Sequence, residues 1–291
     1  MEKKAKYIGV DVGGTKILAQ AFDEKLKVVD EAKRPTKIGR GEKGFLEELY
    51  AVIDSFFHKG IKGIGVAVPG IVDIHKGTLI KAPHLPTGRN FPLVELLRKR
   101  YKVPVCIDND VNAFLAAEKE RPELRKYPNL VAVMVGTGVG GAIASKGELL
   151  YGKNGYAGEV GHMVISKNTD LKSLEQNTSG HFIPAIAKGM GYADVNALSL
   201  EKLRDGKKPA GRKIIGAMAE ALGIGLSNLN LILNPDAFIL GGSIYRVFLS
   251  REKKKLAEII KKHSLGGTCP PLVDASPKST VAKGMVLELI Q

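Results

Sequence analysis

Two glycine-rich turns, each following an apolar strand-like run, constrain the fold of this chain more than any other feature. The first is Ile8–Lys16 (IGVDVGGTK) and the second is Val133–Gly141 (VMVGTGVGG). Glycine has no Cβ, so its backbone N–H can approach a phosphate closely. Between the turns lies an acidic segment, Ile107–Asn112 (IDNDVN). Because a carboxylate at a strand end can bind magnesium or accept a proton, the combination indicates an enzyme that transfers a phosphoryl group from a nucleotide.

The composition is that of a globular protein with a basic charge. The 291 residues are 44% hydrophobic and 25% charged, enough for one large domain or two lobes. The formal net charge of +14 attracts nucleotide phosphates. Nucleic-acid binding requires a basic stripe or a recognised module, and the sequence shows neither. Basic runs such as Arg251–Lys255 are typical of a solvated helix face, so no nucleic-acid partner is expected.

The cysteines and the hydropathy pattern predict a cytoplasmic protein with no membrane partner. Cys106 and Cys269 lack the spacing of a metal site and fit a reducing compartment. Cys106 lies in an apolar run, where a buried and inert thiol is expected. Charged residues follow Met1, which is not the pattern of a secretory peptide, and no apolar run approaches the ~18 residues that span a membrane.

Strand and helix patterns alternate along the chain in two similar series. Each half contains a strand, a glycine turn, a second strand and later a strand leading into a helix, which is a loose internal duplication. This alternation predicts an α/β fold. The predicted strands are 7–12, 17–22, 27–32, 61–68, a hairpin at 71–80, 103–107, 130–135, 141–145, 148–150 and 237–240. The predicted helices are 44–58, 92–100, 111–118, 198–203, 214–233, 245–263 and 280–290.

Three segments together resemble the ROK family (repressor, open reading frame, kinase) of sugar kinases and regulators: Asp11–Lys16, Asn109–Asn112 and Gly158–His162. The resemblance covers nearly the whole chain. It implies a two-lobed α/β protein with the actin-like, hexokinase-like (ribonuclease H-like) ATPase fold, built from duplicated mixed β-sheet domains around a central cleft. We expect one lobe of residues 1–115 plus a C-terminal helix at about 280–291, and a larger lobe of residues 116–279.

The resemblance assigns the glycine turns to ATP and its magnesium ion. The phosphates would contact both turns, the adenosine would border a third turn at a strand end, and Asp11 would hold Mg²⁺ through water. The spacing is not that of a Walker A loop. Taken alone, each turn is also compatible with a glycine-rich hairpin that binds no ligand. The predicted nucleotide-binding residues are Gly13, Gly14, Thr15, Lys16, Gly136, Thr137, Gly138, Gly241 and Gly242.

The acidic turn supplies the predicted catalytic residue, Asp110. It follows an apolar run and begins a predicted helix, so it is also a candidate N-cap, and Asp108 is an alternative cap. In the catalytic interpretation Asp110 is the general base that accepts the proton of a sugar hydroxyl. By the resemblance, the adjacent Asn109 contacts the sugar.

Further sugar contacts are predicted from the resemblance. Carboxylates and imidazole match adjacent sugar hydroxyls, although His162 taken alone is also compatible with a hydrogen-bonded core histidine. Glu175 resembles the glutamate of the Cys-Leu-Glu that closes the family's sugar site. The loop Ala82–Asn90 resembles the Ala-Pro-Asn-Leu-Pro-Gly-Trp segment of family glucokinases but lacks the tryptophan. The predicted sugar-binding residues are Gly70, Gly88, Arg89, Asn109, Asp110, Glu159, His162 and Glu175.

The chain departs from the family in its zinc motif. Many members have Cys-x-Cys-Gly-x-x-Gly-Cys between the histidine and the last glutamate. The interval Met163–Ser173 contains no cysteine, and Ser173 stands where the last one would be. We therefore expect no structural zinc and another means of ordering the loop.

The predicted function is that of an ATP- and Mg²⁺-dependent hexose kinase, a glucokinase of glycolysis that phosphorylates the 6-hydroxyl of glucose. An N-acetylhexosamine kinase is the alternative, because Gly88–Arg89 replaces Gly-Trp. A sugar-responsive repressor needs a DNA-reading element before the first strand, and only Met1–Lys6 precedes it, so we do not expect one. A non-catalytic sugar binder is a further alternative. The family resemblance also makes a homodimer possible.

Overall fold

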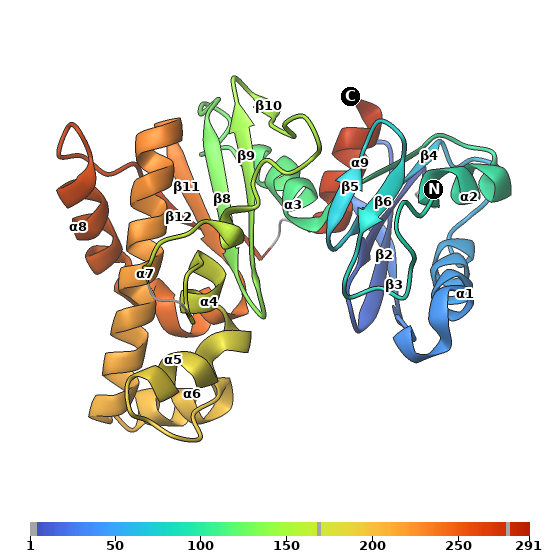
Figure 1. Ribbon diagram of the computed structural model, residues 1–291. Coiled ribbons are helices and arrows are strands. Elements are labelled where there is room, and N and C mark those ends of the chain that lie inside the picture. Colours follow the sequence, from blue (N-terminus) through green and yellow to red (C-terminus); the bar gives the residue numbers. More distant parts are fainter. Residues whose placement is uncertain (1–4, 168–169, 278–279) are drawn as a thin grey trace. The chain divides into compact units, whose positions relative to one another are not determined.

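The computed structural model describes residues 5–167, 170–277 and 280–291, and the chain divides into two compact units (Figure 1). Unit 1 runs through Lys126 and takes in Tyr151–Ala157 and Ser276–Gln291. Unit 2 comprises Tyr127–Leu150 and Gly158–Ala275. Helix α3 (Asp110–Lys119), which spans the boundary predicted at residue 115, belongs to unit 1.

Unit 1 is built on a five-stranded mixed sheet with the order β3-β2-β1-β4-β7. The first three strands form an antiparallel meander, and β4 and β7 run parallel to β1. The predicted strands are confirmed within a few residues. Their bounds are β1 (Tyr7–Val12), β2 (Lys16–Phe22), β3 (Val28–Pro35), β4 (Gly63–Val68) and β7 (Val105–Asn109), and the predicted hairpin is β5 (Ile71–Asp73) and β6 (Thr78–Lys81).

Helices cover both faces of this sheet. The 3₁₀ turn η1 (Ile38–Arg40) leads into α1 (Gly41–Asp54), which with α2 (Leu93–Tyr101) packs against one core cluster. The prediction that the first helix continues to His58 is wrong. The N–H of Phe56 bonds to the carbonyl of Ile53, three residues back, which is the tighter bonding of a helix terminus.

Glycines allow α9 (Val281–Ile290) to pack closely within unit 1. A Cβ at Gly9 of β1 would lie 2.0 Å from the carbonyl oxygen of Ala282. A Cβ at Gly284 would lie 1.6 Å from the carbonyl oxygen of Ala113 in α3. The backbone of α9 therefore approaches both the sheet and α3 at distances that no larger side chain permits.

Unit 2 repeats the sheet pattern of unit 1, with the order β10-β9-β8-β11-β12. Two antiparallel pairs are followed by two parallel pairs, as in unit 1. The predicted duplication of mixed sheets is thus confirmed, while β12 is a strand that the sequence did not reveal. The bounds are β8 (Leu130–Val135), β9 (Val139–Ser145), β10 (Glu148–Leu149), β11 (Ala237–Gly241) and β12 (Leu272–Asp274).

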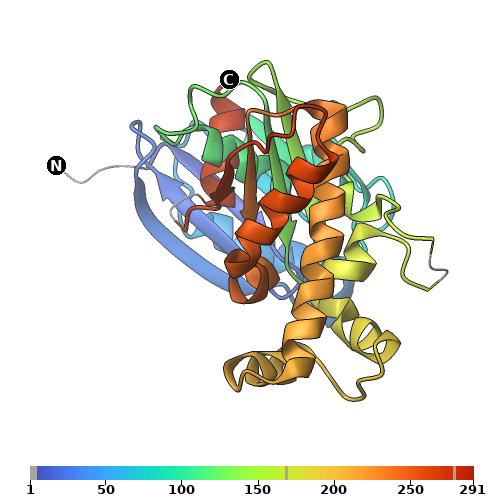
Figure 2. The same cartoon turned by 90° about the vertical axis from the view of Figure 1, so that its left-hand side faces the viewer.

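The helices of unit 2 pack around the long α7, which lies beside α8 (Figure 2). They are η2 (Val160–His162), α4 (Leu174–Thr178), η3 (Gly180–Phe182), α5 (Ile183–Gly189), α6 (Ala197–Asp205), α7 (Pro209–Leu233), the π-helix η4 (Tyr245–Leu249), η5 (Ser250–Glu252) and α8 (Lys253–His263). The single helix predicted over 245–263 is wrong. The N–H of Ser250 bonds to the carbonyl of Tyr245, five residues back, and its hydroxyl bonds to the carbonyl of Arg246.

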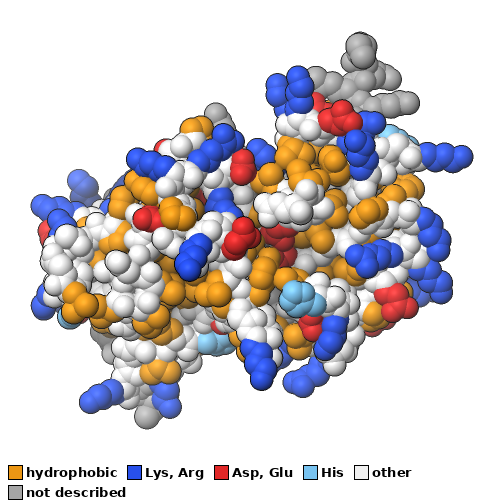
Figure 3. Space-filling model, turned by 90° about the horizontal axis from the view of Figure 1, so that it is seen from above, with side chains coloured by type: hydrophobic (Ala, Val, Ile, Leu, Met, Phe, Trp, Pro, Cys, Tyr) orange, Lys and Arg blue, Asp and Glu red, His pale blue; other side chains and the backbone are white. Residues whose placement is uncertain are grey.

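Helix α7 meets the length and apolar composition of a membrane span, but 67% of its most apolar stretch is buried within the structure. The sequence analysis predicted this helix over 214–233 but found no apolar run of membrane-spanning length, because polar residues such as Ser227 and Asn230 interrupt it; both are buried. Burial of this kind is typical of a core helix. On the face shown in Figure 3, Lys and Arg side chains are scattered and form no single stripe.

Candidate active site

The carboxyl ends of three parallel strands bring the predicted residues of unit 1 to one edge of its sheet. In the strand register Asp11 of β1 pairs with Ala67 of β4, which pairs with Asp108 of β7. Neighbouring strands lie about 4.8 Å apart, so the Cα atoms of Asp11 and Asp108 are separated by about 10 Å. Gly70, Asn109 and Asp110 follow directly at the same edge, which is where ligands bind in open α/β sheets.

Asp11 has the features of a magnesium ligand that acts through water. Burial raises the pKa of its carboxyl group, and the nearby Lys16 opposes that shift. Within residues 5–167, 170–277 and 280–291, no hydrogen bond to this carboxylate is found. The same residues contain no group of three or more His, Cys, Asp or Glu side chains placed to hold a metal. A single carboxylate together with phosphates and water is a typical ligand set of Mg²⁺, so Asp11 fits this ion.

Hydrogen bonds within the first glycine turn, and from Thr36 just after β3, hold this turn in place. The N–H of Gly13 donates to the carbonyl of Lys16 at 2.9 Å, and the hydroxyl of the buried Thr36 donates to the carbonyl of Gly13 at 2.6 Å. The N–H of Thr36 bonds to the carbonyl of Thr15 at 3.1 Å. Thr15 and Lys16 are exposed, so their side chains are available to an anion.

Asn109, and not an aspartate, caps the helix that begins in the acidic turn. Its Oδ1 accepts from the N–H of Val111 at 2.8 Å, and its Nδ2 donates to the carbonyl of Gly70 at 2.9 Å. The alternatives in which Asp108 or Asp110 is the N-cap are therefore wrong. One amide hydrogen and one lone pair of Asn109 remain for a sugar hydroxyl.

Asp110 is the first residue of α3 and is half-buried. Its Oδ1 accepts from the N–H of Val111 at 3.0 Å. A carboxylate at this position is placed to accept a hydrogen bond from a hydroxyl group, as a general base does. Asp108, by contrast, is 1% exposed and accepts from the Asn109 N–H at 2.5 Å, from Asn112 Nδ2 at 3.0 Å and from the Tyr151 hydroxyl at 2.8 Å. Asp108 is therefore a structural carboxylate.

In unit 2 the second glycine turn (Gly136–Gly141) and the third (Gly241–Gly242) lie together at the carboxyl ends of β8 and β11. These strands are parallel, with Gly241 opposite Met134. A Cβ at Gly136 would lie 3.7 Å from the Ser243 hydroxyl, which follows the third turn. Gly242 has φ +92° and its Cβ would lie 2.3 Å from the carbonyl oxygen of Val135, so this position requires glycine. The turns thus form one continuous backbone surface.

The second turn is fixed by the segment after α4. The N–H of Gly136 bonds to the carbonyl of Gly138 at 2.9 Å. The N–H of Gly180 bonds to the carbonyl of Gly136 at 2.9 Å, and that of His181 bonds to the carbonyl of Thr137 at 3.1 Å. Gly180 and His181 carry no recognisable sequence signal, and the prediction missed them.

Glu159 immediately precedes η2 and His162 ends it, and both lie at the surface of unit 2. Their side chains are 39% and 80% exposed, with His162 Nε2 at 3.8 Å from Glu159 Oε2. The alternative interpretation of His162 as a core histidine is therefore wrong. Two adjacent exposed groups of this kind can each bind a hydroxyl.

Glu175 contacts the second glycine turn. Its Oε2 accepts from the N–H of Val139 at 2.8 Å, and a Cβ at Gly138 would lie 2.7 Å from the same oxygen. This contact was not predicted. The hydrogen bond from Val139 occupies Oε2 of Glu175, which leaves Oε1 for the predicted sugar contact.

The cysteine-free loop before Glu175 is ordered by backbone bonds and a capping box. Ser173 caps α4 by accepting from the Gln176 N–H, while the Gln176 side chain bonds to the Ser173 N–H at 3.0 Å. The N–H of Ile165 bonds to the carbonyl of Lys172 at 2.9 Å. A serine therefore nucleates the helix at the position of the missing cysteine. Residues 168 and 169 of this loop lie outside the described ranges.

The loop 82–90 is anchored by Leu85, which is buried, whereas Gly88 and Arg89 are exposed. No atom lies within 4 Å of a Cβ built at Gly88. A Cβ at Gly14 would lie 3.6 Å from the Cβ of His84, so the loop passes beside the first glycine turn. Gly88 and Arg89 are thus free of packing that would fix them.

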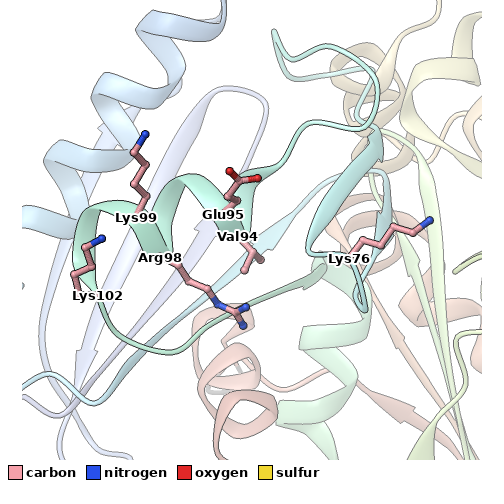
Figure 4. A pocket seen from close by; sticks show the side chains of 6 residues that line it. All are labelled: Lys76, Val94, Glu95, Arg98, Lys99 and Lys102. Atoms are coloured by element: carbon pink, nitrogen blue, oxygen red, sulfur yellow. The ribbon is translucent and has the colours of Figure 1, made fainter.

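A surface pocket of about 580 Å³ lies beside α2 and contains none of the predicted site residues (Figure 4). Arg98 donates to the carbonyl of Val105 at 2.9 Å, and Lys76 pairs with Asp73 at 3.4 Å. Two of the cationic side chains that line this pocket, Arg98 and Lys76, therefore already have partners. The lining residues are Lys76, Val94, Glu95, Arg98, Lys99 and Lys102.

The ROK family matches residues 7–283, almost the whole chain. The chain belongs to the ROK family. This ROK protein is 31% identical to a putative xylose repressor of Caldicellulosiruptor sp. (strain Rt8B.4), over 88% of this chain and 72% of the relative. It is 28% identical to a glucokinase of Halalkalibacterium halodurans, over 93% and 88% of the two chains. It is 27% identical to an N-acetyl-D-glucosamine kinase of Pectobacterium atrosepticum, over 88% and 91%.

Among solved structures, the ROK hexokinase from Thermus thermophilus matches with a TM-score of 0.85 at 25% identity, over 97% of both chains. The predicted family and the α/β, actin-like ATPase fold with mixed sheets are therefore confirmed. The ROK relatives include kinases and repressors, so membership alone does not define the activity of this chain.

Proposed function

We propose that this ROK protein is an ATP-dependent sugar kinase that transfers the γ-phosphoryl group to the 6-hydroxyl of a hexose, with glucose as the first candidate. The observation that carries the proposal is the edge of the unit 1 sheet. There, the exposed first glycine turn, a carboxylate suited to Mg²⁺ (Asp11) and a half-buried carboxylate at a helix N-terminus (Asp110) follow parallel strands. The proposal places the enzyme in cytoplasmic carbohydrate metabolism, with a homodimer as its possible assembly.

In this proposal Asp110 acts as the general base. Its carboxylate orients the sugar hydroxyl and accepts the proton as the hydroxyl oxygen bonds to the γ-phosphorus and the bond to the leaving ADP oxygen breaks. A positioned base typically contributes about 10²–10⁴-fold in rate. Magnesium, when held by Asp11 through water, neutralises phosphate charge. The glycine turns would bind the phosphates through backbone N–H groups, and Asn109, Glu159, His162 and Glu175 would bind sugar hydroxyls.

The second candidate is an N-acetylhexosamine kinase. The exposed loop 82–90 supports it, because the open space at Gly88 and the exposed Arg89 leave room for a substituent larger than a hydroxyl. The relative from Pectobacterium atrosepticum is named N-acetyl-D-glucosamine kinase. A non-catalytic sugar-sensing regulator is the remaining alternative, in line with the name of the Caldicellulosiruptor relative.

The test is a panel of sugars with ATP and Mg²⁺, with ADP release as the readout. We expect turnover with glucose above that with N-acetylglucosamine and N-acetylmannosamine. Asp110→Asn should lose about 10²–10⁴-fold in kcat while sugar binding by calorimetry is retained. Turnover restricted to N-acetylhexosamines would favour the second candidate. Sugar binding without turnover of any panel member would contradict the kinase proposal, and near-normal turnover by Asp110→Asn would refute the assignment of the base.

A further inference from the structure

The buried carboxyl group of Asp108 meets the half-buried Glu288 close in sequence to the candidate base. Asp108 is the penultimate residue of β7, two residues before Asp110, and its carboxyl group is hydrogen-bonded to that of Glu288 from α9. Glu288 is separated from the acidic turn by most of the chain. The two side chains therefore link the C-terminal helix to the strand end that carries Asn109 and Asp110.

Asp108 is surrounded by donors. The Asn109 N–H and the Asn112 amide donate to Oδ1, and the Tyr151 hydroxyl donates to Oδ2. Glu288 has a different environment, because its Oε1 is buried and accepts no hydrogen bond from the described residues. An ionised carboxylate oxygen without a donor is costly to bury, whereas the carbonyl oxygen of a neutral acid is much less so.

Two adjacent carboxyl groups that are largely withdrawn from water disfavour the doubly ionised state, so the pair holds one proton. Burial raises the pKa of Asp108 as well, but the hydrogen bonds from the three other donors oppose that shift, and Glu288 has no such donors, so the ionised form is favoured at Asp108. Burial, with the charge and hydrogen bond of Asp108, raises the pKa of Glu288 well above its ordinary value of 4.5.

The other charged and titratable groups around Glu288 do not reverse this. Lys119 on α3 favours the ionised form, but it is a smaller influence than burial and Asp108. Cys106 on β7 and Tyr151 are held neutral, because burial raises the pKa of both groups. The charge of Arg98 lowers the pKa of the Cys106 thiol, but by less than burial raises it. The strands β1 and β4 meet α9 through Gly9, Gly63 and Gly65, which bring no charge, and through Tyr7, which packs against Ala282 and Val286.

We propose that Glu288 is a positioning residue that, as a neutral carboxylic acid, donates a hydrogen bond to the Asp108 carboxylate and thereby fixes the Asn109–Asp110 strand end for catalysis. Glu288 acts through Asp108 and touches no substrate. The same Asp108 carboxylate holds the Tyr151 hydroxyl, so it also anchors the segment Tyr151–Ala157 to unit 1.

The kinetic part of this inference rests on the proposed kinase function. Glu288→Gln keeps a neutral donor for Asp108 and should retain kcat within about threefold, whereas Glu288→Leu removes the donor at similar volume. Because misplacement by about 1 Å can cost 10²-fold, we expect Glu288→Leu to lose at least about tenfold in kcat with little change in the KM for ATP. Equal kcat for both variants and the wild type would overturn the positioning role.

A second measurement does not depend on activity. Between pH 4.5 and the raised pKa, the folded protein retains the Glu288 proton and the unfolded chain releases it, so wild-type stability falls as pH rises. The Glu288→Gln variant does not lose stability in this way, because glutamine releases no proton in this pH range. We expect its Tm relative to wild type to increase steadily from pH 5 to pH 9, and a constant difference would overturn the neutral acid.

The matched control is Glu118→Gln. Glu118 is also buried, but it pairs with Arg121 at 2.6 Å and accepts from the Ser276 N–H at 2.9 Å. Its substitution should lower Tm throughout the pH range. If the wild type phosphorylates no sugar, the kinase proposal fails, while the Tm comparison still decides the protonation of Glu288.

Discussion

The contact between Glu175 and the second glycine turn predicts a defect in Gly138→Ala. A Cβ at this position would lie 2.7 Å from Glu175 Oε2, about 0.7 Å closer than ordinary van der Waals contact at 3.4 Å. The backbone of Gly138 does not have positive φ, so alanine fits the main chain. The carboxylate must therefore move, and it loses its 2.8 Å hydrogen bond from the Val139 N–H.

A hydrogen bond to a charged group contributes about 1.5–3 kcal/mol, which corresponds to roughly 10- to 150-fold. We expect kcat/KM for ATP to fall by up to that range in Gly138→Ala, and Tm to fall by a few degrees because the same hydrogen bond no longer stabilises the fold. Steady-state kinetics at saturating sugar and calorimetry with a non-hydrolysable ATP analogue measure the effect. Gly189→Ala is the control, since no atom lies within 4 Å of its Cβ.

A double-mutant cycle distinguishes the proposed cause from a general disturbance. If Gly138→Ala acts through the carboxylate, then Glu175→Ala alone should produce the same loss in kcat/KM for ATP, and the double variant should lose little more. Gly136→Ala places its Cβ 3.7 Å from the Ser243 hydroxyl and should have a smaller effect. Additive losses in the double variant, or an equal loss in Gly136→Ala, would refute the reasoning.

Two further predictions test the metal ligand and the packing of α9. Asp11→Asn should raise the Mg²⁺ concentration for half-maximal activity by at least about tenfold. Because burial raises the pKa of Asp11, the wild-type requirement for Mg²⁺ should increase as pH falls toward that raised value; an unchanged requirement in Asp11→Asn would exclude this ligand. Gly284→Ala places a Cβ 1.6 Å from the Ala113 carbonyl oxygen and should destabilise by about 3 kcal/mol in denaturant unfolding, whereas Gly189→Ala should be neutral.

The sequence predicted those parts of the fold that depend on local pattern. The strands before the glycine turns are apolar runs of normal length, and α7 has a clear helical periodicity. The three-residue strand β12 has no such pattern, because its formation depends on pairing with β11. The helix predicted over 245–263 failed because the side-chain and π-type bonds of Ser250 compete with α-helical bonds.

The candidate site was predictable to the level of residue type and position, but not of partner. The acidic turn was recognised, yet its sequence alone did not show that Asn109 caps the helix and that Asp108 is enclosed. Those roles depend on Gly70, Tyr151 and Glu288, which are distant in sequence. Likewise, the contact between Glu175 and Val139 joins residues 36 positions apart. Such contacts arise only when the chain is folded.

The placement of α9 in unit 1 has a consequence for biosynthesis. The ribosome makes residues 127–275, which include all of unit 2, before it makes Val281–Ile290. Unit 2 can therefore acquire its core on the nascent chain, while the sheet made first still lacks the helix that fits over Gly9 and Gly65. Unit 1, which is translated first, is therefore completed last, and until then one face of its sheet lacks the helix that covers it.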